Sequence, residues 1–96
     1  MQLKWSEPAT NDLEEVEAFI ARDNSPVVAI DVVLKIIDAT EGLLPVHPEA
    51  GRSGRMRGTR ELVIDGVPYV VVYRLNKTER WVEVLRVLHD AQQWPQ

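Results

Sequence analysis

The spacing of apolar positions changes abruptly near the start of the chain. Residues 2–6 roughly alternate between apolar and polar side chains, which predicts a short first strand. From Ser6 the spacing becomes helical, with Ser6 as the N-terminal cap and Pro8 in the first turn. The apolar side chains that follow are Leu13, Val16, Phe19 and Ile20. We therefore expect a first helix whose acidic residues, Asp12 among them, form a solvated face.

A second helix is predicted almost immediately afterwards. Asn24-Ser25-Pro26 repeats the signal of a cap followed by proline, and Gly42 and Pro45 end the apolar pattern near Leu44. So short a link between the helices favours an antiparallel helical hairpin. Apolar side chains cover a wider arc of this second helix than one sheet contact requires. Two explanations remain open, namely deep packing in the core or a face that binds a partner chain.

The second half of the chain predicts a loop followed by strands. Residues 47–58 have no apolar period and contain three glycines, one proline and three arginines, so we expect a loop. Beyond it, Asp65-Gly66 separates two apolar runs, as in a hairpin whose turn needs a positive φ. A third apolar run follows another turn and completes a three-stranded meander. The expected strands cover 60–64, 67–75 and 80–88, and a short tail covers 89–95.

The predicted order of elements is strand, helix, helix, strand, strand, strand. This order predicts an α+β domain in which the helical hairpin packs on one face of a largely antiparallel, four-stranded sheet. A chain of 96 residues fits a single domain covering residues 1–96. We expect the other face of the sheet and the basic loop to serve function.

Composition narrows the chemistry. The chain has no cysteine, which excludes disulfides, thiolate zinc sites and thiol nucleophiles. It has no apolar run of about 18 residues and no secretory leader, so we expect a cytoplasmic protein without membrane contact. The net charge of −4 hides a split: residues 1–50 carry ten acidic and three basic side chains, whereas residues 51–96 carry five acidic and eight basic ones. An anionic partner would therefore meet the second half.

Five short segments, spread over nearly the whole chain, form a recognisable series. They are Trp5-Ser6-x-Pro8-Ala9-x-x-Asp12-Leu13-Glu14, Gly51-Arg52, Gly58-Thr59-Arg60-Glu61-Leu62-Val63, Tyr69 through Tyr73-Arg74, and Val84-Leu85-Arg86-Val87-Leu88-His89 continuing to Trp94-Pro95. No single segment is specific, but their order and spacing together resemble the RelE/ParE superfamily of bacterial toxins. The resemblance implies the toxin of a type II toxin-antitoxin system, which a cognate antitoxin holds inactive.

The resemblance leaves two mechanisms open, because members of this superfamily either poison DNA gyrase or cut mRNA on the ribosome. For gyrase poisoning, the ParE-like mechanism, we expect the target to be bound by Arg52, Arg55, Arg57, Arg60 and Trp94. For RNA cleavage, the RelE-like alternative, His89 would move protons while Arg60, Arg74 and Arg86 stabilise the phosphorane. A third alternative is a non-toxic relic that only binds its antitoxin.

Each of these side chains also has an ordinary structural interpretation. The arginines fit an exposed loop in which Arg60 and Arg86 pair with Glu61 or Glu83. His89 fits a structural or binding role, and Trp94 fits an anchor that packs the tail on the sheet. Since arginine stays protonated, it can stabilise charge but cannot act as the base.

We favour the ParE-like mechanism, in which the protein is an inhibitor and not an enzyme. The sequence pI near 5.1 suits a protein target better than ribosomal RNA. The lysines and C-terminal tyrosine of several ribonuclease members are also missing. We expect no cofactor, metal or small-molecule substrate; an enzyme would be a metal-independent endoribonuclease. The antitoxin would lay a helix or strand over the second helix, at Val28, Val32 and Ile36, or along the sheet edge.

Overall fold

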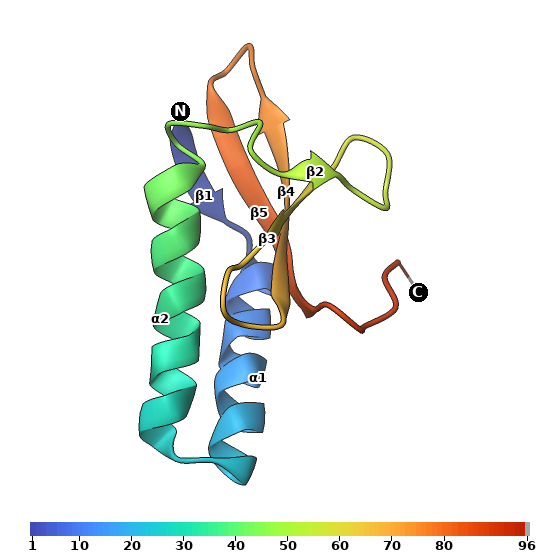
Figure 1. Cartoon of the computed structure of the whole chain (residues 1–96). Helices are drawn as coiled ribbons and strands as arrows, with labels where there is room; N and C mark the ends of the chain where they lie inside the picture. The colour runs from blue at the N-terminus through green and yellow to red at the C-terminus, as the bar shows by residue number, and fades with distance from the viewer. Residues whose placement is uncertain (96) are drawn as a thin grey trace.

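Two helices lie side by side across one face of a five-stranded sheet (Figure 1). This architecture comes from a computed structural model, in which residues 1–95 are described. The strands are β1 (Gln2–Trp5), β2 (Arg52–Ser53), β3 (Arg60–Val63), β4 (Tyr69–Asn76) and β5 (Trp81–His89), and the helices are α1 (Glu7–Asp23) and α2 (Pro26–Leu43). The α+β class and the order of the main elements are as predicted.

Both helices begin where the sequence predicts. The Ser6 hydroxyl accepts a hydrogen bond from the Ala9 amide at 3.2 Å, and the Ser25 hydroxyl accepts one from the Val28 amide at the same distance. Each helix also has a proline in its first turn, where the missing N–H costs nothing. The hairpin of helices follows from these two local signals.

The sheet has the order β1-β5-β4-β3-β2. The meander β3-β4-β5 is antiparallel as expected, whereas β1 pairs with β5 in parallel. The prediction of four strands was wrong, because Arg52 and Ser53 pair with Glu61 and Arg60 and add a fifth. This strand has only two residues, so no alternation marks it within the expected loop.

A β-bulge lies in β5 opposite β4. Val72 pairs with Arg86 while Tyr73 pairs with Val84, so Leu85 is the extra residue. Because of this insertion, Val84 and Val87 both belong to the core on the helix side, although they are an odd number of residues apart. The bulge also sets the position of Arg86, which matters for the site.

The core has two parts, one on each face of the sheet. The larger part lies between the sheet and the helices and includes Ile36, Tyr73 and Leu44, each fully buried. On the outer face Val70, Val72 and Leu88 form a small cluster against which Trp94 packs. The outer face is therefore partly covered by the C-terminal segment, and is not free along its whole length as the sequence suggested. Within residues 1–95, neither helix is long and apolar enough to span a membrane.

Candidate functional site

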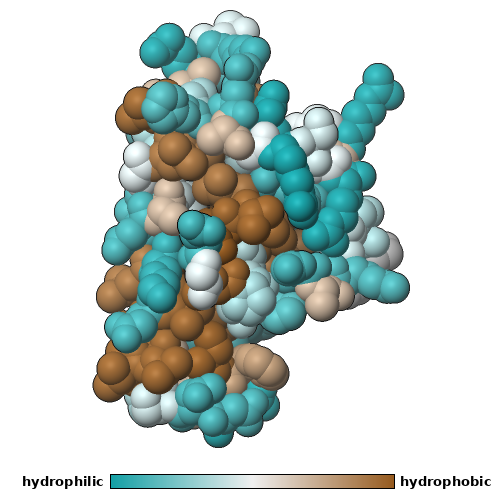
Figure 2. All heavy atoms as spheres, in the orientation of Figure 1, coloured by the Kyte–Doolittle hydropathy of each residue, from teal (hydrophilic) through white to brown (hydrophobic). Residues whose placement is uncertain are grey.

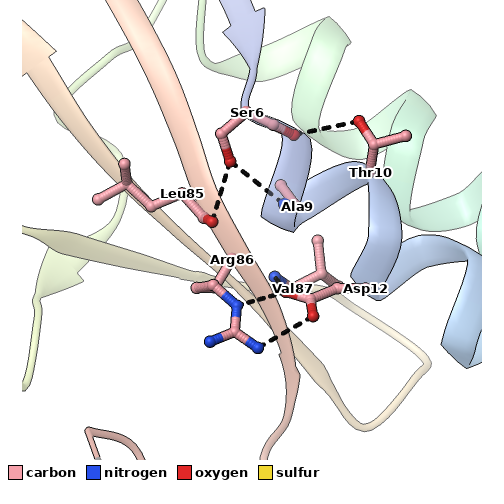
Figure 3. A network of polar contacts seen from close by, with 7 residues as sticks. All are labelled: Ser6, Ala9, Thr10, Asp12, Leu85, Arg86 and Val87. Carbon is pink, nitrogen blue, oxygen red and sulfur yellow. Dashed lines mark hydrogen bonds and ion pairs between the residues drawn. The ribbon is translucent and has the colours of Figure 1, made fainter.

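An ion pair joins α1 to the end of β5 (Figure 3). Asp12 accepts hydrogen bonds from Nε and Nη2 of Arg86, at 2.7 and 3.0 Å, and from the Val87 amide at 2.9 Å. The hydrogen bonding of Arg86 to the Asp12 carboxylate raises the pKa of Arg86. Asp12 is 8% exposed, so the expectation of a solvated acidic face was wrong at this residue. The prediction that Arg86 pairs with Glu61 or Glu83 was also wrong, because its partner is Asp12 on α1.

The carboxylate of Glu61 lies buried beneath the basic loop, on the outer face of the sheet. Its Oε1 accepts from Nη2 of Arg52 at 3.1 Å, and its Oε2 accepts from the Arg55 amide at 2.9 Å and faces Arg55 Nε at 3.3 Å. Burial alone would raise the pKa of Glu61, but these hydrogen bonds and the two guanidinium charges outweigh it and lower that pKa. The loop arginines are thus fixed by a carboxylate that sequence reasoning assigned to Arg60 or Arg86.

Tyr73 fixes the start of the same loop from the helix side of the sheet. Its hydroxyl donates to the Pro48 carbonyl and accepts from the Gly51 amide, both at 2.8 Å, and its burial raises its pKa. Arg60 donates from Nη1 to the Gly51 carbonyl at 2.9 Å. Arg60 therefore supports the backbone of the loop instead of pairing with a carboxylate.

His89 lies at the rim of a pocket of about 290 Å³ between α1 and the end of β5. Its Nδ1 accepts from the Ala91 amide at 3.1 Å, which leaves the proton of the neutral ring on Nε2. The ring also meets Tyr69 edge-on, with centroids 5.5 Å apart. Arg86 lines the same pocket, together with apolar and acidic side chains of α1. The pocket brings together a histidine and an arginine already paired with Asp12.

The four residues of the expected nuclease site do not converge. Tyr69, which pairs with His89, is five residues before Arg74 on β4, and this separation is about 17 Å along a strand. Arg74 is bound to Glu83 at 2.8 Å, and Arg60 is engaged at the loop. Of the four, only His89 and Arg86 line a common pocket within residues 1–95, and each of the three arginines is engaged by another group, so the expected phosphorane clamp is not assembled there.

Comparisons with known proteins agree with this fold. The family model described as "ParE toxin of type II toxin-antitoxin system, parDE" matches residues 3–94. The chain belongs to this family. "Putative toxin Y4kP" of Sinorhizobium fredii is 40% identical over 95 residues, which cover 99% of this chain and 94% of that protein.

Solved toxin structures share the fold of this ParE-family chain. A chain of the chromosomal ParDE toxin-antitoxin system from P. aeruginosa is 26% identical, with a TM-score of 0.84 over 93% of this chain and 95% of its own. The RelBE2 toxin-antitoxin complex from Mycobacterium tuberculosis aligns with a TM-score of 0.68 at 20% identity, over 95% of this chain and 92% of its own. The second likeness concerns the fold alone.

The expected target-binding residues of this ParE-family chain fall into three environments. Arg52 and Arg55 share the Glu61 carboxylate, and Arg60 contacts backbone carbonyls. Arg57, which is exposed, has no ion pair or side-chain hydrogen bond with residues 1–95. Trp94 packs on the outer cluster, as an anchor of the C-terminal segment would. The loop and this segment lie on the side of the sheet away from the helices (Figure 1).

The expected antitoxin-binding residues differ in exposure. Val28 is 41% exposed and Val32 is half-buried, but Ile36 is fully buried in the core. Ile36 is therefore unavailable to a partner, because it faces the sheet. The side chains that sequence reasoning passed over lie on another flank of α2, and their helical spacing of three and four residues marks them as one stripe: Val27, Ile30 and Leu34, each about half exposed or more.

Proposed function

We propose that this chain is a toxin that a cognate antitoxin neutralises, and that it inhibits growth by binding DNA gyrase and trapping the complex with cleaved DNA. The observation that favours this mechanism over RNA cleavage is that two of the cations are already held in ion pairs. Arg74 is paired with Glu83 and Arg86 with Asp12, so neither guanidinium is free to neutralise a phosphorane beside His89. A protein target requires no such constellation.

Charge supports the same choice. With a formal net charge of −4, the chain has little general attraction for ribosomal RNA, whose binding depends on neutralised phosphates. Four of its eleven lysines and arginines lie close together in the sequence, in or directly after one loop. Arg52, Arg55, Arg57 and Arg60 together with Glu61 carry a local charge of +3, which suits an acidic patch on a protein.

We assign the target-binding surface to the loop and the C-terminal segment beside it. The loop presents Arg57 and the half-exposed Met56 at its tip, so it offers one unpaired cation next to one apolar side chain. Interfaces are enriched in arginine, methionine and aromatic side chains. This pairing supports a role for the loop tip in target binding.

We assign the antitoxin-binding surface to α2. The side chains of the stripe, Val27, Ile30 and Leu34, are each about half exposed or more, and hydrophobic surface runs down this side of the molecule in Figure 2. Amphipathic helices bind such stripes through their own apolar face. An antitoxin segment is the occupant that the family suggests, and the structures similar in fold include toxin-antitoxin complexes.

The proposal is tested with purified toxin and two assays run side by side. Toxin released from its antitoxin is added to gyrase with relaxed plasmid, and separately to a translation extract with defined mRNA. We expect supercoiling to stop and cleaved DNA to accumulate while the mRNA stays intact. Normal supercoiling with mRNA cleavage that His89→Ala abolishes would overturn the gyrase mechanism. A protein that is inactive in both assays would favour the third alternative, a relic that only binds its antitoxin.

One observation favours the nuclease as second candidate. His89 and Arg86 do line a common pocket, with the Nε2 proton of His89 unused by residues 1–95. A histidine in this position could exchange protons with a bound nucleotide. The mRNA arm of the experiment decides this alternative.

A further inference from the structure

The loop that carries the arginines has almost no apolar support of its own. Met56 is 42% exposed, and Arg52, Ser53 and Arg57 are exposed as well. The loop is closed on itself by the Gly54 amide, which donates to the Thr59 carbonyl at 2.8 Å. Near its tip, the loop is attached to the sheet by polar contacts, and Glu61 provides them.

The Glu61 carboxylate makes contacts at two points of the loop. It accepts a hydrogen bond from Arg52 at the loop's first strand residue and one from the Arg55 amide three residues later, and it forms an ion pair with the Arg55 side chain. Glu61 is 1% exposed, so these contacts replace the water that the charge has lost. A buried carboxylate with these donors fixes the loop, because moving the loop would leave the charge unpaired.

The same arginine reaches the C-terminal segment. While Nε of Arg55 faces Glu61 at 3.3 Å, its Nη1 donates to the Gln92 carbonyl at 3.0 Å. Two residues further, Trp94 packs on Val70, Val72 and Leu88. Arg55 is thus a bridge between a carboxylate on β3 and the backbone of the tail.

We propose that Glu61 is a positioning residue that, through Arg55, holds the basic loop and the C-terminal segment together as one target-binding surface. The proposal rests on the function proposed above, since the target is the one that this surface binds. Glu61 itself is buried and touches no target. It acts by fixing where Arg55 points, so that two segments about 35 residues apart in the chain are presented in one arrangement.

The physical reason lies in the balance of charge. Without the carboxylate, Arg52 and Arg55 would repel each other and Arg57, and the loop has no apolar anchor to oppose this. With it, the three arginines carry a smaller net charge and two of them are fixed. A disordered loop would lose conformational entropy when it binds the target, whereas a preformed loop avoids most of that cost.

The test compares Glu61→Gln with Glu83→Gln in the full chain. Glu83 also pairs with an arginine on the sheet, Arg74, but within residues 1–95 its side chain has no hydrogen bond or ion pair with the loop or the tail, so it is the matched control. Each toxin is measured for gyrase inhibition, for antitoxin affinity and, by nuclear magnetic resonance, for exchange of the Arg55 amide and mobility of residues 91–94. For Glu61→Gln we expect about tenfold weaker inhibition, faster exchange and greater mobility, with antitoxin affinity within about twofold of the parent.

Two results would overturn the proposal. One is a Glu61→Gln toxin whose tail stays as rigid as in the parent. The other is a loss of gyrase inhibition matched by an equal loss of antitoxin affinity, since that indicates general unfolding. If the parent toxin itself leaves gyrase unaffected, the proposed function fails, and the mobility of loop and tail alone then decides whether Glu61 holds them together.

A second variant serves if Glu61→Gln does not fold. Arg55→Ala keeps the backbone amide that Glu61 accepts from but removes the bridge to Gln92. We expect the loop amide to stay protected while residues 91–94 become mobile and inhibition weakens by about tenfold. A tail that stays ordered in this variant contradicts the bridge.

Discussion

Asp12 and Arg86 are 74 residues apart in the sequence and form a two-pronged ion pair, with bonds of 2.7 and 3.0 Å. The same carboxylate also accepts a hydrogen bond from the amide of Val87, just after the bulge in β5. One side chain of α1 thus satisfies both the charge and the backbone at the place where β5 has no β1 neighbour, since β1 pairs only as far as Val84. The Asp12 side chain of α1 thus provides the acceptor that a longer β1 would have offered to the Val87 amide.

Removing this carboxylate should destabilise the fold. We expect Asp12→Ala to lower the free energy of unfolding by about 2 to 3 kcal/mol, because Arg86 and the Val87 amide both lose their acceptor. Asp12→Asn keeps one acceptor oxygen and should cost less. Urea unfolding measures both, with Glu14→Ala as the control on the exposed side of α1. Equal losses for Asp12→Ala and Glu14→Ala would show that the pair contributes nothing.

Two glycines should respond in opposite directions to alanine. A Cβ at Gly51 would lie 2.7 Å from the Tyr73 hydroxyl oxygen and 2.9 Å from the Glu61 carbonyl oxygen, so Gly51→Ala should cost about 1 to 3 kcal/mol. At Gly42, in the last turn of α2, nothing lies within 4 Å, and Gly42→Ala should stabilise by about 0.5 to 1 kcal/mol. Thermal unfolding of the two variants gives the comparison. A neutral Gly51→Ala would contradict the close approach of loop and tyrosine.

Stability in acid should depend on Glu61. Its folded-state pKa lies below the ordinary value of 4.5, so its ionised form stabilises the fold fully above that pH. This stabilisation is lost as the pH falls through the lower, folded-state pKa. We expect the free energy of unfolding of the parent to drop more steeply than that of Glu61→Gln as the pH falls below 4.5. Parallel pH profiles for the two proteins would be inconsistent with a titrating Glu61.

The apolar stripe of α2 should decide antitoxin affinity. Leu34→Glu places a charge on a half-exposed side chain, so we expect antitoxin binding to weaken at least about tenfold. Folding should change little, because Leu34 is 48% exposed. Lys35→Glu adds the same side chain on the polar stripe next to it and serves as the control. Calorimetric titration with the antitoxin gives both affinities, and equal effects would move the interface elsewhere.

Arg57 offers the cleanest test of the loop in target binding. Neither Arg57 nor Arg80 has a side-chain hydrogen bond or ion pair with the part of the chain the structure describes, so alanine should leave the fold intact at either position. Arg57→Ala should raise the toxin concentration needed to inhibit gyrase about tenfold. Arg80→Ala, in the turn between β4 and β5, should not. An unchanged Arg57→Ala toxin would exclude the loop tip from the target interface.

Features set by neighbouring residues were predictable from the sequence. The serine caps, the first-turn prolines and the Asp65-Gly66 turn each act over a few residues, and Gly66 has the positive φ of 80° that such a turn requires. The meander follows because adjacent strands joined by short turns pair with each other. The helical hairpin follows in the same way from its short link.

Features set by distant partners were not predictable. The strand Arg52–Ser53 exists only because β3 offers a free edge, and two residues carry no alternation. A lone glutamate in a strand, such as Glu61, has the same sequence signal as an exposed one. Ile36 and Leu34 are equally apolar, and only the direction of the sheet separates the buried side chain from the exposed one. The resemblance to toxins identified the family but not these contacts.

The strand that is made last occupies an inner place in the sheet. β5 lies between β1 and β4, so the first strand has no neighbour until residues 81–89 have been translated. Pairing of β1, the first strand made, is therefore a contact between distant parts of the chain, and the sheet cannot close before β5 is in place. A product truncated before residue 81 lacks this inner strand, leaves β1 without a partner and cannot form the five-stranded sheet.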